Sequence, residues 1–260
     1  MRLVTYSVGP GGPARAGVRV GHRVLDVEAA SRVKGEPLPS SMKALLAAGR
    51  GALSRVRALA KAATTEARSF SQAMHEERAI RLLAPVPDAD HFISAAGLQR
   101  PDRNAGLVGQ DAKVSRAAGS ARLACKPQLV FVIGRQAQDV AGDDALECVA
   151  GVTILNDFPG CAPMGPEIVT LDEIPDPFDL WMTLSVNGAE RMRASTQERA
   201  ATLPSMLAQY SREFAIEAGD LVATGMPGTQ DLFLDAGDVV ECSLVGIATL
   251  RTVVVAPAGA

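Results

Sequence analysis

The sequence predicts an α+β fold that is mostly β, with a small N-terminal α/β domain at residues 1–85 and a β-roll or barrel-like C-terminal domain at residues 86–260. Three observations lead to this prediction. Helical spacing of apolar residues is concentrated in the first part of the chain. Strand-like segments dominate from Phe92 onward, and a segment with two prolines, residues 83–87, separates the two parts. Many strands with one late helix are typical of a β-roll or barrel-like domain.

The N-terminal domain is predicted to begin with short strands and to continue with helices. Strands are expected at residues 3–6, 16–20 and 23–27, with glycine-rich turns between them. Two helices are expected at residues 41–46 and 52–67, because apolar residues recur there at helical spacing after the cap-like Pro39-Ser40. The domain therefore combines a small sheet with a helical layer.

The C-terminal domain shows three local signals. The apolar run Leu129–Ile133 ends at Gly134, as expected for a strand buried on both faces. Asn187-Gly188 predicts a tight hairpin turn, because both residues tolerate positive φ. Residues 203–214 have the apolar spacing of an amphipathic helix. Further strands are expected at residues 149–155, 180–186, 221–224, 239–244 and 249–255.

Composition excludes several classes of protein. The 260 residues have a formal net charge of −3 and no cluster of basic and aromatic residues, which argues against nucleic-acid binding. No apolar run approaches the about 20 residues that span a bilayer, so no membrane association is expected. The start of the chain resembles a strand rather than a signal peptide, which predicts a cytoplasmic protein.

Cysteine and histidine positions give little sign of a site. Cys125, Cys148, Cys161 and Cys242 are scattered and are interpreted as packing residues, with Cys161 the one thiol close in sequence to a candidate site residue. The three histidines share no metal-like spacing and are predicted to lie on the surface; they are His22, His75 and His91.

Several segments carry a resemblance to a known family. The run from Gly165 to Pro177 is followed by the hairpin at residues 186–188 and by Gly219–Gly228, and residues 236–241 and 246–250 complete the series. In this order the segments resemble the fumarylacetoacetate hydrolase family, in its short bacterial acylpyruvase-type form. The resemblance implies the family's β-roll domain and a homodimer built through it. It also implies activity on small 2-oxo acids with Mg²⁺ or Mn²⁺.

The metal ligands that the resemblance implies are largely missing. The family has Glu-x-Glu on one strand and an aspartate on the next, whereas this chain has Lys126 and Gln128 at the glutamate positions and retains only Asp157. A lysine brings a positive charge where a cation should bind, and Mg²⁺ prefers several hard oxygen ligands. No metal and no other cofactor is therefore predicted.

Other catalytic parts of the family pattern are also absent. Arg103 stands where the resemblance implies a histidine general base, and a guanidinium cannot accept a proton at neutral pH. Only residues 158–164 separate Asp157 from Gly165, so the segment that should carry a catalytic lysine is missing. These correlated losses predict that metal-dependent hydrolysis has been lost.

The remaining polar residues give the candidate site. Lys126 and Asp157 are the candidate catalytic residues, because strand pairing is expected to bring them together as an ion pair in which the ammonium replaces the metal's charge. The alternative is that Lys126 points to solvent. Candidate residues for binding a small carboxylate are Arg103, Gln128, Thr224 and Gly225, the last two in a turn whose N–H groups and hydroxyl can hold an anion.

Three functions remain open at this point. A catalytically silent homologue, serving as a binding or partner subunit, is favoured. The first alternative is metal-independent decarboxylation, tautomerisation or dehydration of a small oxo-acid by Lys126 and Asp157. The second is residual metal-dependent acylpyruvate-type hydrolysis. A homodimer is expected by resemblance, and a heteromeric partner is the other option.

Overall fold

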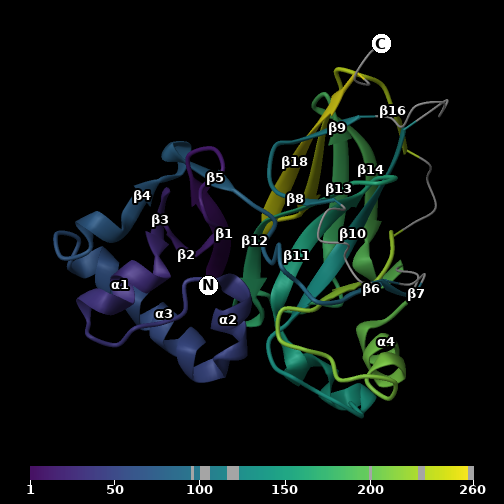
Figure 1. Cartoon of the computed structure of the whole chain (residues 1–260). Coiled ribbons are helices and arrows are strands. Elements are labelled where there is room, and N and C mark those ends of the chain that lie inside the picture. The colour runs from purple at the N-terminus through teal and green to yellow at the C-terminus, as the bar shows by residue number, and fades with distance from the viewer. Residues whose placement is uncertain (95–96, 100–105, 116–122, 199–200, 228–231, 257–260) are drawn as a thin grey trace.

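The computed structural model describes residues 1–94, 97–99, 106–115, 123–198, 201–227 and 232–256. The N-terminal part contains β1 (Arg2–Val8), β2 (Arg15–Val20), β3 (Arg23–Asp26), α1 (Val27–Val33), α2 (Met42–Ala47), α3 (Gly49–Thr65), β4 (Met74–Glu76) and β5 (Ile80–Leu82). It forms the left-hand part of the molecule in Figure 1, where α1, α2 and α3 cover the small strands.

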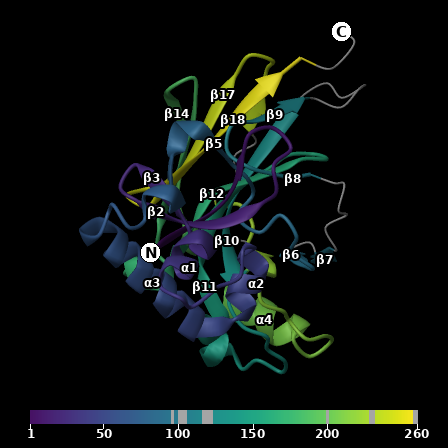
Figure 2. The ribbon, with the colours of Figure 1, turned by 60° about the vertical axis from the view of Figure 1, so that its left-hand side comes forward.

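The remaining elements form the C-terminal part (Figures 1 and 2). They are β6 (Phe92–Ser94), β7 (Gly97–Gln99), β8 (Leu107–Val108), β9 (Ala112–Ser115), β10 (Leu123–Ile133), β11 (Val149–Asp157), β12 (Ala162–Thr170), β13 (Trp181–Val186), β14 (Ala189–Ser195), α4 (Leu203–Tyr210), β15 (Leu221–Ala223), β16 (Leu232–Leu234), β17 (Val239–Leu244) and β18 (Ala248–Val255).

The described strands form two sheets. The larger has the central order β4-β3-β2-β1-β12-β11-β10-β15-β6-β7, and the smaller has the order β14-β13-β17-β18-β9. Neither order closes on itself within the described residues, so the C-terminal part is a roll of open sheets. The α+β, mostly β prediction is confirmed.

The two parts of the chain share one sheet. β1 pairs antiparallel with β12, with Arg2 opposite Val169 and Leu3 opposite Ile168. One apolar cluster also combines residues of α2 and α3, such as Leu45 and Val56, with C-terminal residues such as Val130. The first 85 residues are thus built directly onto the central sheet.

The central strands alternate between two cores because successive side chains of a strand point to opposite faces. Leu129 and Phe131 of β10 pack into the core between the two sheets. Val130 and Val132 face the core beneath the N-terminal helices. This explains the unbroken apolar run in β10, which is covered on both faces.

Local signals predicted several elements well. Asn187 and Gly188 have φ values of 53° and 79° and join β13 to β14, as the hairpin prediction required. Helix α4 begins as predicted, with its Thr202 hydroxyl accepting a hydrogen bond from the Ser205 amide, but it ends at Tyr210 rather than residue 214.

Helix α1 and strand β12 are two of the elements that were not predicted. Helix α1 begins directly after β3, where the Asp26 carboxylate accepts a hydrogen bond from the Ala29 amide and caps the helix. Strand β12 contains glycine and two prolines, which disguised a strand that pairs with both β1 and β11. No helix among the described residues is long and apolar enough to cross a membrane.

Candidate functional site

The candidate site lies on one face of the β10–β11 pair. Lys126 lies directly opposite Asp157 in the antiparallel register, and Gln128 lies opposite Leu155. Lys126 and Gln128 are two residues apart, so their side chains leave the same face of β10. Strand pairing therefore brings Lys126, Gln128 and Asp157 together, as predicted from sequence.

Gln128 is the central contact of this group. Its Nε2 donates a hydrogen bond to Asp157 Oδ2 at 3.1 Å, and its Oε1 accepts one from the Gly225 amide at 3.2 Å. The side chain is 6% exposed. Both ends of the buried amide are thus satisfied, and Gln128 joins β11 to the turn that follows β15.

Asp157 is half-buried at the end of β11. Burial raises the pKa of its carboxyl above the ordinary value, while the Lys126 ammonium and the Gln128 hydrogen bond act in the opposite direction. Removal of water disfavours the charged form more than these two neighbours favour it. Asp157 therefore combines a fixed position with an increased affinity for a proton.

The expected Lys126–Asp157 ion pair is not formed at close range. Lys126 is exposed, and among the described residues no carboxylate oxygen lies within 4.0 Å of its ammonium. A lysine can leave its charge in water while its aliphatic stem lies along the protein. The neutral Gln128 amide instead occupies the buried position beside Asp157, and Lys126 acts on that carboxylate only through space.

The Thr224–Gly225 turn lies against this group. The Thr224 amide donates to the Leu129 carbonyl at 3.3 Å, which fixes the turn to β10. Thr224 is fully buried, and its hydroxyl has no hydrogen-bond partner among the described residues. Because Gln128 accepts the Gly225 N–H, that amide is not free for a ligand in this arrangement.

Arg103 lies outside the described residues. Cys161 faces Phe158 across a tight turn between β11 and β12, and burial raises the pKa of its thiol, which disfavours the reactive thiolate. His91, which was predicted to lie on the surface, is only partly exposed, with 17% of its side chain accessible. Its Nδ1 lies 2.9 Å from Asp220 Oδ2, and its ring packs on Phe214 at a centroid distance of 5.1 Å.

Sequence reasoning missed this His91–Asp220 pair, because the two residues are far apart along the chain and share no motif. Asp220 also accepts hydrogen bonds from the amides of His91 and Glu217. The pair fixes the start of β15, immediately before the Thr224–Gly225 turn. It therefore supports the candidate site without entering it.

The residues present do not fit the divalent metal that the resemblance implies. Asp157 is the one carboxylate of the three positions, and one of its oxygens accepts a hydrogen bond from Gln128. The Gln128 oxygen accepts the Gly225 amide, and an ammonium stands at the remaining position. No group of three or more His, Cys, Asp or Glu residues among the described residues is arranged to hold a metal.

Comparison with known proteins is consistent with this architecture. The E. coli homoprotocatechuate catabolism bifunctional isomerase/decarboxylase is 32% identical over 142 residues, which cover 47% of this chain and 33% of that protein. The match thus spans about a third of the length of that relative. A Bacillus subtilis oxaloacetate tautomerase is 24% identical over 88% of this chain and 91% of its own length.

Solved structures extend the similarity to nearly the whole chain. Maleylpyruvate hydrolase from Sphingobium sp. SYK-6, in complex with manganese(II) and pyruvate, has a TM-score of 0.80 and 25% sequence identity, and the match covers 98% of this chain and 99% of that one. The model of the fumarylacetoacetate (FAA) hydrolase C-terminal family matches residues 76–159 and 156–255, more than half of the chain. The chain therefore belongs to the fumarylacetoacetate hydrolase family.

Proposed function

We propose that this chain binds a small 2-oxo acid, or a similar carboxylate, without a divalent metal and has lost the metal-dependent C–C hydrolysis associated with its family. On this proposal it serves as a catalytically silent binding or partner subunit. The observation that carries the proposal is the bridge made by Gln128. Its side-chain amide donates a hydrogen bond to Asp157 and accepts one from the Gly225 N–H. A side chain used in this way is not available as a metal ligand.

Lys126 supplies the charge that a small carboxylate requires. Lys126 is exposed and lies opposite Asp157 in the β-sheet register, and no described carboxylate oxygen lies within 4.0 Å of its ammonium. An incoming anion can therefore pair with Lys126 without first displacing a partner. The names of the relatives, which include oxaloacetate tautomerases and isomerase/decarboxylases, support a small oxo-acid as the ligand.

Calorimetry tests this proposal. The protein is titrated with oxalate and pyruvate in the presence of a chelator, and separately with Mn²⁺ and Mg²⁺. We expect oxalate to bind without metal and Lys126→Ala to weaken that binding by about tenfold, which corresponds to about 1.4 kcal/mol. Lys113→Ala, at an exposed position of β9, is the matched control and should leave the affinity unchanged. The proposal is contradicted if the unaltered protein binds metal in the micromolar range, or if neither oxalate nor pyruvate gives a binding signal.

A second candidate is metal-independent tautomerisation, decarboxylation or dehydration, which the raised pKa of Asp157 beside the Lys126 cation favours. In the tautomerase form, the Asp157 carboxylate removes a proton from the carbon next to the substrate carbonyl. The electron pair of that C–H bond forms an enolate, and its oxygen takes a proton from the Lys126 ammonium. A water then transfers the proton from Asp157 back to Lys126, so one proton has moved from carbon to oxygen.

The ultraviolet absorbance of enol oxaloacetate distinguishes this candidate from silent binding. If Asp157 is the base, its replacement by asparagine abolishes any acceleration of keto–enol exchange above the buffer rate. Asp139→Asn changes an exposed aspartate with positive φ, which asparagine tolerates, and should keep the full rate. If the unaltered protein gives the same rate of keto–enol exchange as buffer alone, the result supports a catalytically silent homologue.

A further inference from the structure

Charge is divided unequally between the two parts of the chain. Residues 1–85 contain 14 Lys and Arg residues but only 6 Asp and Glu residues, a formal charge of +8. Residues 86–260 contain 12 Lys and Arg residues and 23 Asp and Glu residues, a formal charge of −11. The small net charge of the whole chain therefore hides a basic N-terminal unit, and such asymmetry creates a field that selects partners.

Part of the basic charge holds the N-terminal unit to the rest of the molecule. Arg57 pairs with Asp172 at 2.8 Å, and Lys43 pairs with Asp90 at 2.6 Å. Arg2 and Arg19 each lie 2.7 Å from one oxygen of the buried Glu167 carboxylate. Attachment to the C-terminal part explains these cations but leaves others unused.

The unused cations lie on the remaining surface of the N-terminal unit. Arg50 is exposed and lacks a carboxylate within 4.0 Å among the described residues, but it donates to the Glu147 carbonyl at 3.2 Å. Five further exposed basic side chains of this unit make neither an ion pair nor a side-chain hydrogen bond among the described residues: Arg23, Lys61, Arg68, Arg78 and Arg81. Isolated surface cations are ordinary, but the formal charge of +8 on this unit makes a surface that attracts anions.

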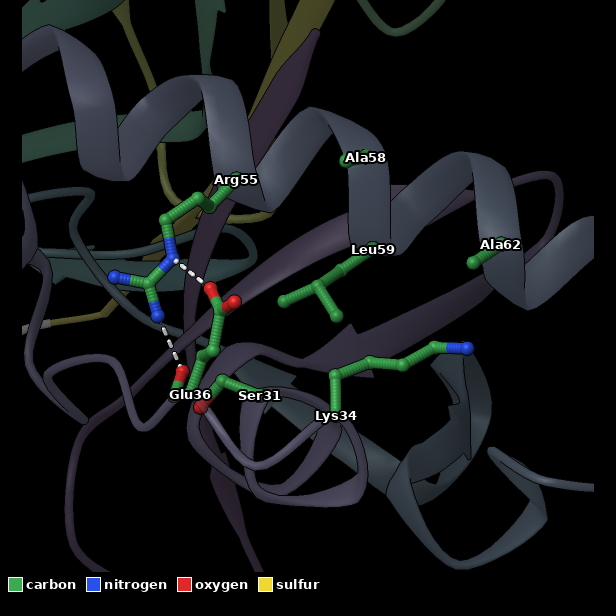
Figure 3. Close-up of a pocket in the computed structure, with 7 residues that line it drawn as sticks. All are labelled: Ser31, Lys34, Glu36, Arg55, Ala58, Leu59 and Ala62. Carbon is green, nitrogen blue, oxygen red and sulfur yellow. Dashed lines mark hydrogen bonds and ion pairs between the residues drawn. The ribbon is translucent and has the colours of Figure 1, made fainter.

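A groove with an apolar floor opens on the same unit, between α3 and the segment that follows α1 (Figure 3). Ala58, Leu59 and Ala62 of α3 form its floor, and Arg55 and Lys34 stand at its two ends. Glu36 also lines the groove and pairs with Arg55 at 3.0 Å. Its volume is about 260 Å³, below the about 300–1,000 Å³ of typical small-molecule pockets. The groove therefore suits apolar side chains of a peptide better than a cofactor.

Two of the unused cations lie close in sequence to residues that line or flank this groove. Lys61 is exposed on α3 next to Ala62. Arg68 lies in the turn after α3, in which the Ser69 amide donates to the Glu66 carbonyl, and Glu66 pairs with Lys34 at 2.8 Å. An exposed apolar side chain, Val33 at 49%, extends the surface beside Lys34. Glu36 and Glu66 pair with the two cations at the ends of the groove, so the excess positive charge near its apolar floor comes from Lys61 and Arg68.

We propose that this groove and its basic surroundings form a docking site for an acidic segment of another protein, a segment with one or two apolar anchors flanked by Asp or Glu. The apolar floor needs anchors that a sugar-phosphate chain lacks, and a flat membrane cannot enter a concave groove. A second copy of this chain fits less well. Its acidic part lies at the opposite end of the molecule (Figure 1), so such pairing would propagate without closing. The proposal concerns a surface apart from the oxo-acid site and does not depend on it.

A random-peptide display library is the probe for this site. Selection on the full-length protein should enrich peptides that combine leucine-like anchors with acidic residues, and Ala58→Glu should weaken the selected peptide by at least about tenfold. Ala58 is exposed, so this change fills the groove and adds a repelling charge without disturbing the core. Ala44→Glu, at an exposed position of α2, is the matched control and should bind as the unaltered protein does.

Charge is tested separately. The double change Lys61→Glu and Arg68→Glu should also weaken the peptide by at least about tenfold, and raising the ionic strength from about 0.01 M to 0.15 M should weaken binding to the unaltered protein. Arg191→Glu, on β14 of the acidic part, is the control and should have no effect. Selection of basic peptides overturns the proposal, as does equal binding by the Ala58→Glu variant. The proposal is also overturned if polyuridylate RNA or phosphatidylserine vesicles bind more tightly than the selected peptide and the Ala58→Glu change does not affect that binding. It is likewise overturned if the protein alone forms oligomers whose growth depends on salt.

Discussion

Asp157 lies opposite Lys126 in the β-sheet register, yet its hydrogen bond comes from Gln128, one step along the same face. A neutral amide is buried at lower cost than an ammonium, and Gln128 also satisfies the Gly225 N–H. Gln128, at a position where the family has a glutamate, therefore links Asp157 to the Gly225 amide within the site. Five predictions test this arrangement and its surroundings.

Replacement of Gln128 by alanine should lower the free energy of unfolding by about 1–3 kcal/mol, because it leaves the buried Gly225 N–H without an acceptor. Urea denaturation followed by circular dichroism measures this. Gln136→Ala is the matched control: its side chain is exposed and donates to Glu217 at 2.9 Å, so its loss should have a much smaller effect. Equal effects of the two changes would show that the Gln128 bridge contributes nothing.

The double change Lys126→Glu and Gln128→Glu should create a metal site. It places three carboxylates, with Asp157, on one sheet face, and Mn²⁺ should then bind with a dissociation constant in roughly the micromolar range and raise the melting temperature. Calorimetry and thermal unfolding give the two readings. Lys126→Glu alone retains the Gln128 amide in its bridge and should bind Mn²⁺ at least about tenfold more weakly. Equally tight binding by the unaltered protein contradicts the loss of the metal site.

The protonation of Asp157 should respond to Lys126. The ammonium lowers the pKa of this carboxyl, so Lys126→Met should raise that pKa further, as carbon-detected NMR titration of Asp157 can measure. Lys113→Met, on β9, should leave the titration unchanged. A lower pKa in the Lys126→Met protein would exclude the through-space interaction.

The same shift predicts how stability depends on pH. The folded protein holds the Asp157 proton more tightly than the unfolded chain does, so this group stabilises the fold below the ordinary pKa of 3.8. The contribution is lost as the pH rises through the raised folded pKa. Relative to the Asp157→Asn protein, which lacks this titration, the unaltered protein should therefore lose stability between about pH 4 and neutrality. Parallel denaturation curves at each pH check this, and a constant difference would refute it.

Loss of the Glu167 carboxylate should destabilise the joint between the two parts of the chain. The side chain is 3% exposed and holds Arg2 and Arg19. Its replacement by alanine leaves both guanidinium groups without their buried partner, and unfolding free energy should fall by about 3–5 kcal/mol. Glu190→Ala removes a carboxylate from an exposed pair with Arg193 and should leave the denaturation midpoint unchanged. Similar midpoints for the two variants would contradict the structural role of Glu167.

Sequence alone determined the features that depend on short-range patterns. The hairpin at Asn187-Gly188 follows from the positive φ that its turn requires, and the doubly buried β10 follows from its apolar run. Strand period and strand pairing also determine that one face of the sheet carries Lys126, Gln128 and Asp157. Strand β12 escaped prediction because its partners β1 and β11, which fix its extended form, are distant in sequence.

Tertiary structure decided which of these residues contact one another. Asp157 is hydrogen-bonded by Gln128 rather than by Lys126 because Gln128 also accepts the Gly225 amide. That amide follows β15, which is far from β10 in the sequence but pairs with it in the sheet. The His91–Asp220 pair likewise forms only when β6 aligns beside β15. Sequence patterns specify which side chains share a face, whereas the choice among hydrogen-bond partners is made by burial, because only the folded chain removes the water that would otherwise satisfy them all.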